Sequence, residues 1–267
     1  MTDTAGNGRN YDPSADHAFP DERVNEVLPF IERDEEINAY LDAQNVNPVT
    51  RMRYNDHGKK HIEIVLNRAL CLYDLLKHGG VEFNAASDQG LEEADEAVII
   101  ALAGKLHDIG HVVHRSDHAY YSIPLASDIL DRILPEFYDT PDRVRVKGEV
   151  LHAILCHHTE EIPLTREAGV IRVCDGLDME RGRSRNPYER GGRGINTVSS
   201  QAIQRVSLQE GEAVPVHVEI EMTDAAGVYQ VDSLLKAKLD DSGLEEFVRI
   251  VAINTRSENE LVQRLEL

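Results

Sequence analysis

Cysteine is scarce in this sequence, and the few cysteines show no sign of pairing. The three of them, Cys71, Cys156 and Cys174, stand in apolar surroundings, and no Cys-x-x-Cys spacing occurs. This pattern argues against a disulfide framework and gives no support to a cysteine-ligated structural zinc site. We expect buried free thiols in a reducing compartment.

Long apolar runs are also missing. No stretch approaches the roughly 18 apolar residues that suggest a membrane-spanning helix. Residues 1–20 are polar and acidic, and they lack the basic start and apolar centre of a signal peptide. We therefore expect a cytoplasmic protein that does not associate with a membrane.

Two common catalytic motifs are absent as well. No Gly-x-Ser-x-Gly sequence supports a serine hydrolase, and Gly104-Lys105 lacks the flanking residues of a P-loop. A single Arg-Gly-Gly-Arg-Gly segment at 190–194 is weak evidence for RNA binding in so acidic a chain.

Positive charge, and lysine in particular, is in short supply. The formal net charge is -20, from 48 acidic and 28 basic residues, and 7 of the basic residues are lysine. Such a surface disfavours nucleic-acid binding, which needs a basic footprint. A small phosphorylated substrate is not excluded, because a bound metal ion reverses the local potential. Many carboxylates with few lysines favour a halophilic, haloarchaeon-like organism, whose internal salt screens charge over about 3 Å at 1 M.

Apolar residues recur at helical spacing through the first two thirds of the chain. The strongest such pattern runs over 59–77 and stops at Gly79-Gly80. A nearly continuous apolar stretch, Ala97 to Leu106, predicts a central buried helix over 92–108. Other helices are expected over 24–41, 120–134, 140–158 and 166–180. No strand pattern appears up to residue 180.

The pattern changes beyond residue 180. Residues 181–194 are rich in Arg and Gly and predict a loop, whereas 214–222 alternates strictly between apolar and polar residues, as a half-buried strand does. A helix over 231–239 and a second strand over 247–253 follow. The expected fold is mainly α, a helical bundle followed by a small α+β C-terminal unit. The expected divisions are a flexible acidic tail at 1–25, a helical domain at 26–185 and an α+β domain at 186–267.

Histidines gather in the helical part, where ten of the 12 lie within residues 57–158. A single histidine is usually an ordinary side chain, but groups on successive helices of a bundle are typical of a metal site. His107-Asp108 ends the buried apolar helix, where an ionisable pair is costly unless it binds something. Asp175 likewise follows an apolar run, and His61 lies on the helix over 59–77. Imidazole mixed with carboxylate suits Mn, Fe, Co, Ni or Zn better than Ca or Mg.

The order of these residues resembles the H…HD…D signature of the HD superfamily of phosphohydrolases. The matching segments are His61-Ile62-Glu63-Ile64-Val65, Lys105-Leu106-His107-Asp108-Ile109-Gly110 and Val173-Cys174-Asp175-Gly176-Leu177-Asp178. The resemblance covers residues 55–185. It implies an HD-domain helical bundle with a divalent metal ion bound by His61, His107, Asp108 and Asp175.

Some members of this superfamily bind two metal ions, with an added His after the HD dipeptide and a His-His pair before the last Asp. His118 and His157-His158 occupy the corresponding places here. The resemblance therefore implies His118, His157 and His158 as further ligands, with Asp108 bridging the two ions. No GYP tripeptide follows Thr159, which disfavours the cyclic-dinucleotide subfamily that carries it. The sequence leaves one ion or two as alternatives.

A divalent ion lowers the pKa of its bound water toward about 7, and Asp108 is expected to orient that water. Phosphoryl transfer also needs cations that offset developing charge. Arg115 is the catalytic candidate, and Arg181 and Arg183 are the substrate-binding candidates. We expect His57, His111 and His114 to be supporting or surface residues.

Three functions are compatible with this pattern. The first is metal-dependent hydrolysis of a small phosphomonoester or phosphodiester by a metal-activated water, and the resemblance implies a nucleotide-like substrate. The second is a di-iron oxygenase of the same fold, and the third is a non-catalytic metal-binding regulatory module. The α+β unit is compatible with ligand binding or with homodimer formation. Activity on generic phosphoesters separates the first function from the others, and oxygen consumption identifies the second.

Overall fold

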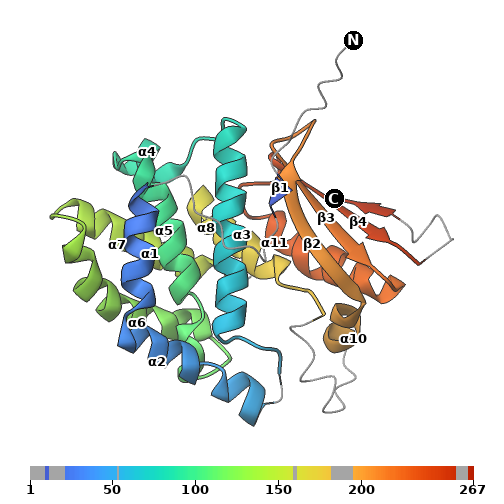
Figure 1. The fold of residues 1–267 in the computed structure, drawn as a ribbon, viewed down its shortest axis with the longest axis horizontal. Coiled ribbons are helices and arrows are strands. Elements are labelled where there is room, and N and C mark those ends of the chain that lie inside the picture. Colours follow the sequence, from blue (N-terminus) through green and yellow to red (C-terminus); the bar gives the residue numbers. More distant parts are fainter. Residues whose placement is uncertain (1–9, 12–21, 53, 159–160, 182–194, 257–263) are drawn as a thin grey trace.

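The computed structural model describes residues 10–11, 22–52, 54–158, 161–181, 195–256 and 264–267, and it has a helical part beside a small sheet (Figure 1). The predicted class, mainly α with a small α+β unit, is confirmed. No described helix combines the length and the apolar character that crossing a bilayer requires.

The helical part follows the expected pattern closely. Its helices are α1 (Glu22–Glu32), α2 (Glu35–Ala43), α3 (Lys59–His78), α4 (Asn84–Gln89), α5 (Glu93–Leu106), α6 (His118–Ile133), α7 (Asp142–Cys156) and α8 (Arg166–Leu177). Short turns of π- or 3-10 helix, η1 (Val46–Arg51), η2 (Ile109–Val112) and η3 (Leu134–Glu136), connect some of them. The pattern over 24–41 is divided between α1 and α2 because the side chain of Asp34 accepts a hydrogen bond from Ile37 N at 2.9 Å and begins a new helix.

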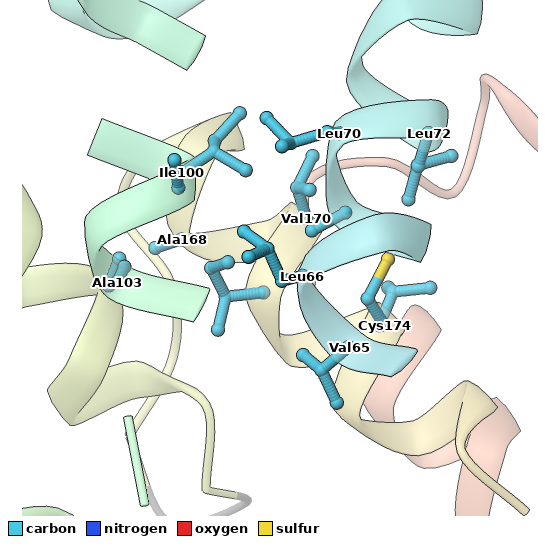
Figure 2. Packing of buried hydrophobic residues seen from close by; sticks show 14 of the residues in the cluster. Val65, Leu66, Leu70, Leu72, Ile100, Ala103, Ala168, Val170 and Cys174 are labelled. Atoms are coloured by element: carbon cyan, nitrogen blue, oxygen red, sulfur yellow. The ribbon is translucent and has the colours of Figure 1, made fainter. Parts of the chain in front are cut away.

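Helix α5 is the centre of the bundle. Every residue from Asp95 to Leu106 is buried, and α5 contacts α1, α3, α4, α7 and α8. Figure 2 shows Leu66 of α3 among side chains of α5 and α8, including Ile100 and Val170. Close packing of this kind holds the end of α5 in a fixed place, and that end carries His107-Asp108.

The C-terminal unit is built on a five-stranded sheet in the order β1-β2-β3-β4-β5. Its strands are β1 (Asn10–Tyr11), β2 (Ile203–Glu210), β3 (Val216–Met222), β4 (Val248–Asn254) and β5 (Arg264–Glu266). The pair β3 and β4 is parallel and the other pairs are antiparallel. The burial of β3 alternates along the strand, as its sequence predicts.

Three strands lie where the sequence predicts none. The two residues of β1 are too few to show a pattern, so the expectation of no strand before residue 180 is wrong there. In β2, an irregular register between Ile203 and Arg205 interrupts the alternation that would reveal a strand. The short β5 alternates exposed and intermediate residues without an apolar face. The expected domain boundaries at 25 and 185 stay predictions.

The C-terminal unit also contains helical segments. They are α10 (Ile195–Ala202), η4 (Ala225–Gly227), the π-helical η5 (Tyr229–Leu235) and α11 (Lys236–Leu239). Helix α8 contacts η5 and α11, and α3 contacts β2 and β3. In Figure 1, α3 lies between the other helices and the sheet. The predicted loop over 181–194 lies outside the described residues from 182 onward.

Glu167 of α8 is buried and caps the short helix α4. Its Oε1 accepts a hydrogen bond from Ala85 N at 2.7 Å, and its Oε2 accepts one from Asn84 N at 3.3 Å. Burial raises the pKa of this carboxyl to about 7, although the two backbone N–H groups oppose that shift.

The folded state therefore binds a proton at Glu167 more tightly than the unfolded chain does, so this group favours folding less as the pH rises. We expect the free energy of unfolding of the wild type to fall relative to that of Glu167→Gln as the pH rises from about 4.5 to about 7. The fall is at most about 1.4 kcal/mol per pH unit. Urea unfolding at a series of pH values measures this, with the exposed Glu246→Gln as control. Parallel stability curves for the wild type and Glu167→Gln would contradict the assignment.

Candidate metal centre

Asp108 lies where the buried helix α5 ends, and imidazoles surround its carboxylate. Its Oδ2 lies 3.2 Å from His61 Nε2 and 3.6 Å from His107 Nε2. Its Oδ1 lies 3.1 Å from His118 Nε2 and 3.5 Å from His157 Nε2. All five residues are buried. Each oxygen of one carboxylate therefore faces its own pair of ring nitrogens.

Glycine at position 110 lets the start of α6 approach this carboxylate. A Cβ on Gly110 would lie 2.0 Å from His118 O and 2.6 Å from Ser122 N, so no larger residue fits there without a shift of backbone. Gly110 N donates to Ser122 Oγ at 2.8 Å, and the Ser122 hydroxyl donates to His107 O at 2.7 Å. These contacts fix His118, at the start of α6, relative to the His-Asp dipeptide.

Backbone carbonyls set the tautomer of three of these histidines. The Nδ1 of His107, His118 and His157 lies 3.0, 2.9 and 2.6 Å from the carbonyl oxygens of Gly104, Arg115 and Ile154 respectively. A carbonyl only accepts, so Nδ1 carries the proton in each ring. In a neutral ring the lone pair of Nε2 then points toward Asp108.

The fourth ring, that of His61, is set by a carboxylate. Its Nδ1 donates to Asp178 Oδ2 at 2.6 Å, which leaves its Nε2 as an acceptor. Two pairs of acceptor nitrogens then face each other: His61 Nε2 lies 3.2 Å from His107 Nε2, and His118 Nε2 lies 2.9 Å from His157 Nε2. Lone pairs at these distances repel one another and the carboxylate unless a proton or a metal ion lies between them. The donor set therefore fits a bound metal ion on each side of Asp108.

The charges of the cluster agree with this arrangement. Burial lowers the pKa of His107 to about 3, so its ring is neutral. Burial opposes ionisation of Asp108 too, but the surrounding imidazoles outweigh it and hold the pKa of the carboxyl well below its usual range. At His118 the carboxylate of Asp108 outweighs burial and raises the pKa of the ring, so this imidazole has to release its proton when a metal ion binds.

The cluster opens into a cavity of about 320 Å³ between the bundle and the C-terminal unit. Asp108, His118 and Asp175 line it on one side, and η5 and α11 contribute Gln230, Ser233 and Lys238. A volume near the lower end of the range for ligand sites suits a small molecule.

Comparison with known proteins supports this reading of the site. A family model, described as HD domain, matches residues 61–180, which include His61, His107-Asp108, His118 and His157. The uncharacterized protein MJ1020 of Methanocaldococcus jannaschii is 38% identical over 220 residues, which cover 82% of this chain and 85% of that protein. The chain belongs to the HD-domain family.

A more distant relative of this HD-domain protein is Ribonuclease Y of Desulforamulus reducens, 27% identical over 189 residues. The match covers 70% of this chain and 32% of the ribonuclease, so the chain spans about a third of that relative's length. No solved structure matches. The HD domain defines a superfamily of metal-dependent hydrolases, and the buried His and Asp groups of this chain are suited to a divalent metal.

Asp175 and His158, two further predicted ligands, lie at the edge of the cluster and line the cavity. Asp175 Oδ1 is 3.4 Å from His61 Nε2, while its Oδ2 accepts a hydrogen bond from Lys238 Nζ at 2.6 Å. His158 is exposed, and the centroid of its ring lies 5.4 Å from that of His118. Its place as a ligand stays a prediction.

Two histidines that the sequence assigns a minor role contact Asp108 directly. His57 Nδ1 donates to Asp108 Oδ2 at 2.8 Å, and His111 Nε2 lies 3.5 Å from Asp108 Oδ1. Among the described residues, neither ring nitrogen of His111 has a hydrogen-bond partner. Together with Asp108 these two residues form another group able to hold an ion. Their spacing, four residues before His61 and three after Asp108, is the sequence signal for them. His114, by contrast, is exposed.

The predicted arginines differ in position. Arg115 lines the cavity, and its guanidinium carbon lies 3.6 Å from the centroid of the Tyr54 ring. Arg181 is exposed, its backbone N–H donates to Ile203 O, and it is not among the described residues that line the cavity. Arg183 lies outside the described residues. The catalytic role of Arg115 and the substrate-binding roles of Arg181 and Arg183 stay predictions.

Asp178, a residue to which the sequence gives no role, connects His61 to the C-terminal sheet. Arg68 lies 3.9 Å from Asp178 Oδ1 and donates to Glu180 Oε1 at 2.7 Å. The same Glu180 oxygen accepts from Val206 N of β2 at 3.0 Å. Carboxylates behind metal-binding histidines orient the ring and raise its basicity.

We expect Asp178→Asn to weaken metal binding by about 10- to 100-fold, because His61 loses the anionic acceptor of its Nδ1 proton. Competition of the metal-free protein against a fluorescent chelator for Mn²⁺ or Zn²⁺ measures this. Asp128→Asn, an exposed position on α6, is the matched control. Equal metal affinity in the two variants would show that Asp178 does not support the centre.

Proposed function

We propose that this HD-domain protein hydrolyses a phosphomonoester or phosphodiester bond in a small, nucleotide-like substrate. The observation that carries the proposal is Asp108, whose Oδ2 lies within 3.6 Å of His61 and His107 Nε2 and whose Oδ1 lies within 3.5 Å of His118 and His157 Nε2. A carboxylate shared in this way suits two divalent ions, which bind and activate water and offset charge on a phosphoryl group. Members of the family with two ions use the same order of residues.

The residues of this chain have separate tasks in the proposed reaction. His61, His107, His118, His157 and Asp175 would hold the ions together with Asp108, and the hydrogen bonds to Nδ1 of the four histidines keep the rings oriented. Arg115, stacked on Tyr54, brings a fixed positive charge to the cavity wall. Desolvated cations beside a reacting phosphoryl group stabilise the charge that develops on it.

The size of the cavity and the charge of the protein favour a small substrate over a nucleic acid. A cavity of about 320 Å³ accommodates a molecule of nucleotide size. The net charge of -20 disfavours a polyanion that contacts a wide surface. The name of the distant relative, Ribonuclease Y, supports phosphodiester chemistry as one of the two candidate reactions.

We expect Asp108→Ala to lose metal binding and hydrolysis together, because both groups of histidines depend on its carboxylate. Turnover of p-nitrophenyl phosphate and bis(p-nitrophenyl) phosphate with added Mn²⁺ measures the second loss. Far-UV circular dichroism checks that the fold is kept, and Asp128→Ala serves as control. Turnover retained in Asp108→Ala would refute the proposal.

Metal content per chain distinguishes one ion from two. We expect about two equivalents of Mn, Fe, Co, Ni or Zn in protein purified without chelator, since each oxygen of Asp108 has its own pair of ring nitrogens. Treatment with EDTA is expected to abolish turnover, and added metal to restore it. One equivalent would restrict the centre to His61, His107, Asp108 and Asp175. Iron together with oxygen consumption would favour the oxygenase, and no metal after reconstitution would exclude a metal enzyme.

A further inference from the structure

Lys238 places an ammonium group beside the metal centre from outside the HD domain. It lies on α11 of the C-terminal unit, its side chain is 14% exposed, and it lines the cavity. Its Nζ donates to Asp175 Oδ2 at 2.6 Å and to the backbone oxygen of His157 at 2.9 Å. We propose that Lys238 binds a phosphoryl oxygen of the substrate, an inference that rests on the proposed phosphohydrolase function.

The side chain of Lys238 packs against α8 at a glycine, so it is more closely held than a lysine that extends into solvent. A Cβ on Gly176 would lie 2.8 Å from Lys238 Cδ and 3.2 Å from Leu235 Cδ1. Two helical turns earlier on α8, a Cβ on Gly169 would lie 2.1 Å from the backbone oxygen of Ser242, which follows α11 in the chain. Both glycines are on α8, so this helix leaves room for the segment that carries Lys238.

The ammonium group has a donor left for a ligand. It carries three N–H groups, and the contacts of the described residues use two of them, at Asp175 and His157. The remaining donor belongs to a side chain that lines the cavity. An anion bound at the metal centre next to Asp175 is therefore within reach of Lys238.

The positive charge of Lys238 matters because carboxylates line the cavity. The cavity is lined by three carboxylates, those of Asp108, Asp175 and Asp178, in a protein with a net charge of -20. A phosphate entering this site meets repulsion unless cations offset it. Lys238 and Arg115 are the lysine and arginine among the described lining residues, and Lys238 contacts a predicted ligand of the metal directly.

The C-terminal unit is thus part of the substrate site. Ser200, Gln230 and Ser233 of the same unit line the same cavity and offer hydroxyl and amide groups. A substrate whose phosphoryl group contacts Lys238 has its remaining groups against this polar wall. The wall then selects among phosphorylated molecules, while the HD domain supplies the reaction.

Binding of inorganic phosphate to the Mn²⁺-loaded full chain tests the role of Lys238. Isothermal titration compares the wild type with Lys238→Met, Lys238→Gln and Lys238→Arg. The control is Lys236→Met, which removes a lysine of the same helix that pairs with Asp240 at 2.7 Å on the surface. Binding of Mn²⁺ and the melting temperature are measured for every variant.

We expect Lys238→Met and Lys238→Gln to bind phosphate at least about tenfold more weakly, because a hydrogen bond to a charged group is lost. Their Mn²⁺ stoichiometry is expected to match that of the wild type. Lys238→Arg is expected to keep most of the phosphate affinity, and Lys236→Met all of it.

Three results would overturn the inference, and they have different meanings. Wild-type phosphate affinity in both Lys238→Met and Lys238→Gln would show that the ammonium does not contact phosphate. Loss of Mn²⁺ from these variants would make Lys238 a residue that only positions Asp175. Failure of the loaded wild type to bind phosphate, with no turnover of phosphoesters, would reject the proposed function and this inference together.

Discussion

The structure depends on keeping one ionised carboxylate, that of Asp108, inside a protein. Burial of an unpaired charge costs several kcal/mol, and here the side chain is almost completely buried. The cost is offset because the end of a packed helix and the starts and ends of its neighbours bring imidazoles to both oxygens. Histidines held by backbone carbonyls cannot rotate away, so the bundle is organised around a charge that needs cations.

Motif order in the sequence was enough to identify the residues around Asp108. His61, His107, His118 and His157 lie where a helical bundle with that order would bring them, because each follows or lies on a helix whose apolar pattern is clear. His57 and His111 are harder to assign, since their spacing from His61 and Asp108 is the one signal that the sequence gives, and their contact with Asp108 shows only in the fold. The helix class and the alternating strand β3 were also readable, because both follow from simple periodicity.

Other features depend on tertiary contacts that no local pattern encodes. Lys238 is one lysine in a short helix, and nothing in its neighbourhood of sequence connects it with Asp175, 63 residues earlier. The hydrogen bonds from Arg68 to Glu180 and from Val206 to the same carboxylate join three segments that are distant in the chain. Strand β2 escaped notice because its register is irregular. Such contacts depend on tertiary packing. A sequence predicts them only where a known motif includes the residues.

Pairing of β1 with β2 has a consequence for the way the protein is made. Asn10 and Tyr11 emerge from the ribosome long before Gln209 and Leu208, the residues with which they pair. The helices of the bundle are all synthesised before β2 is, because the last of them, α8, ends at Leu177. The bundle can therefore pack before β1 has a strand to pair with. Closing a loop of this length carries an entropic cost that grows only slowly with length. The edge of the sheet therefore forms late, after synthesis of the helical bundle.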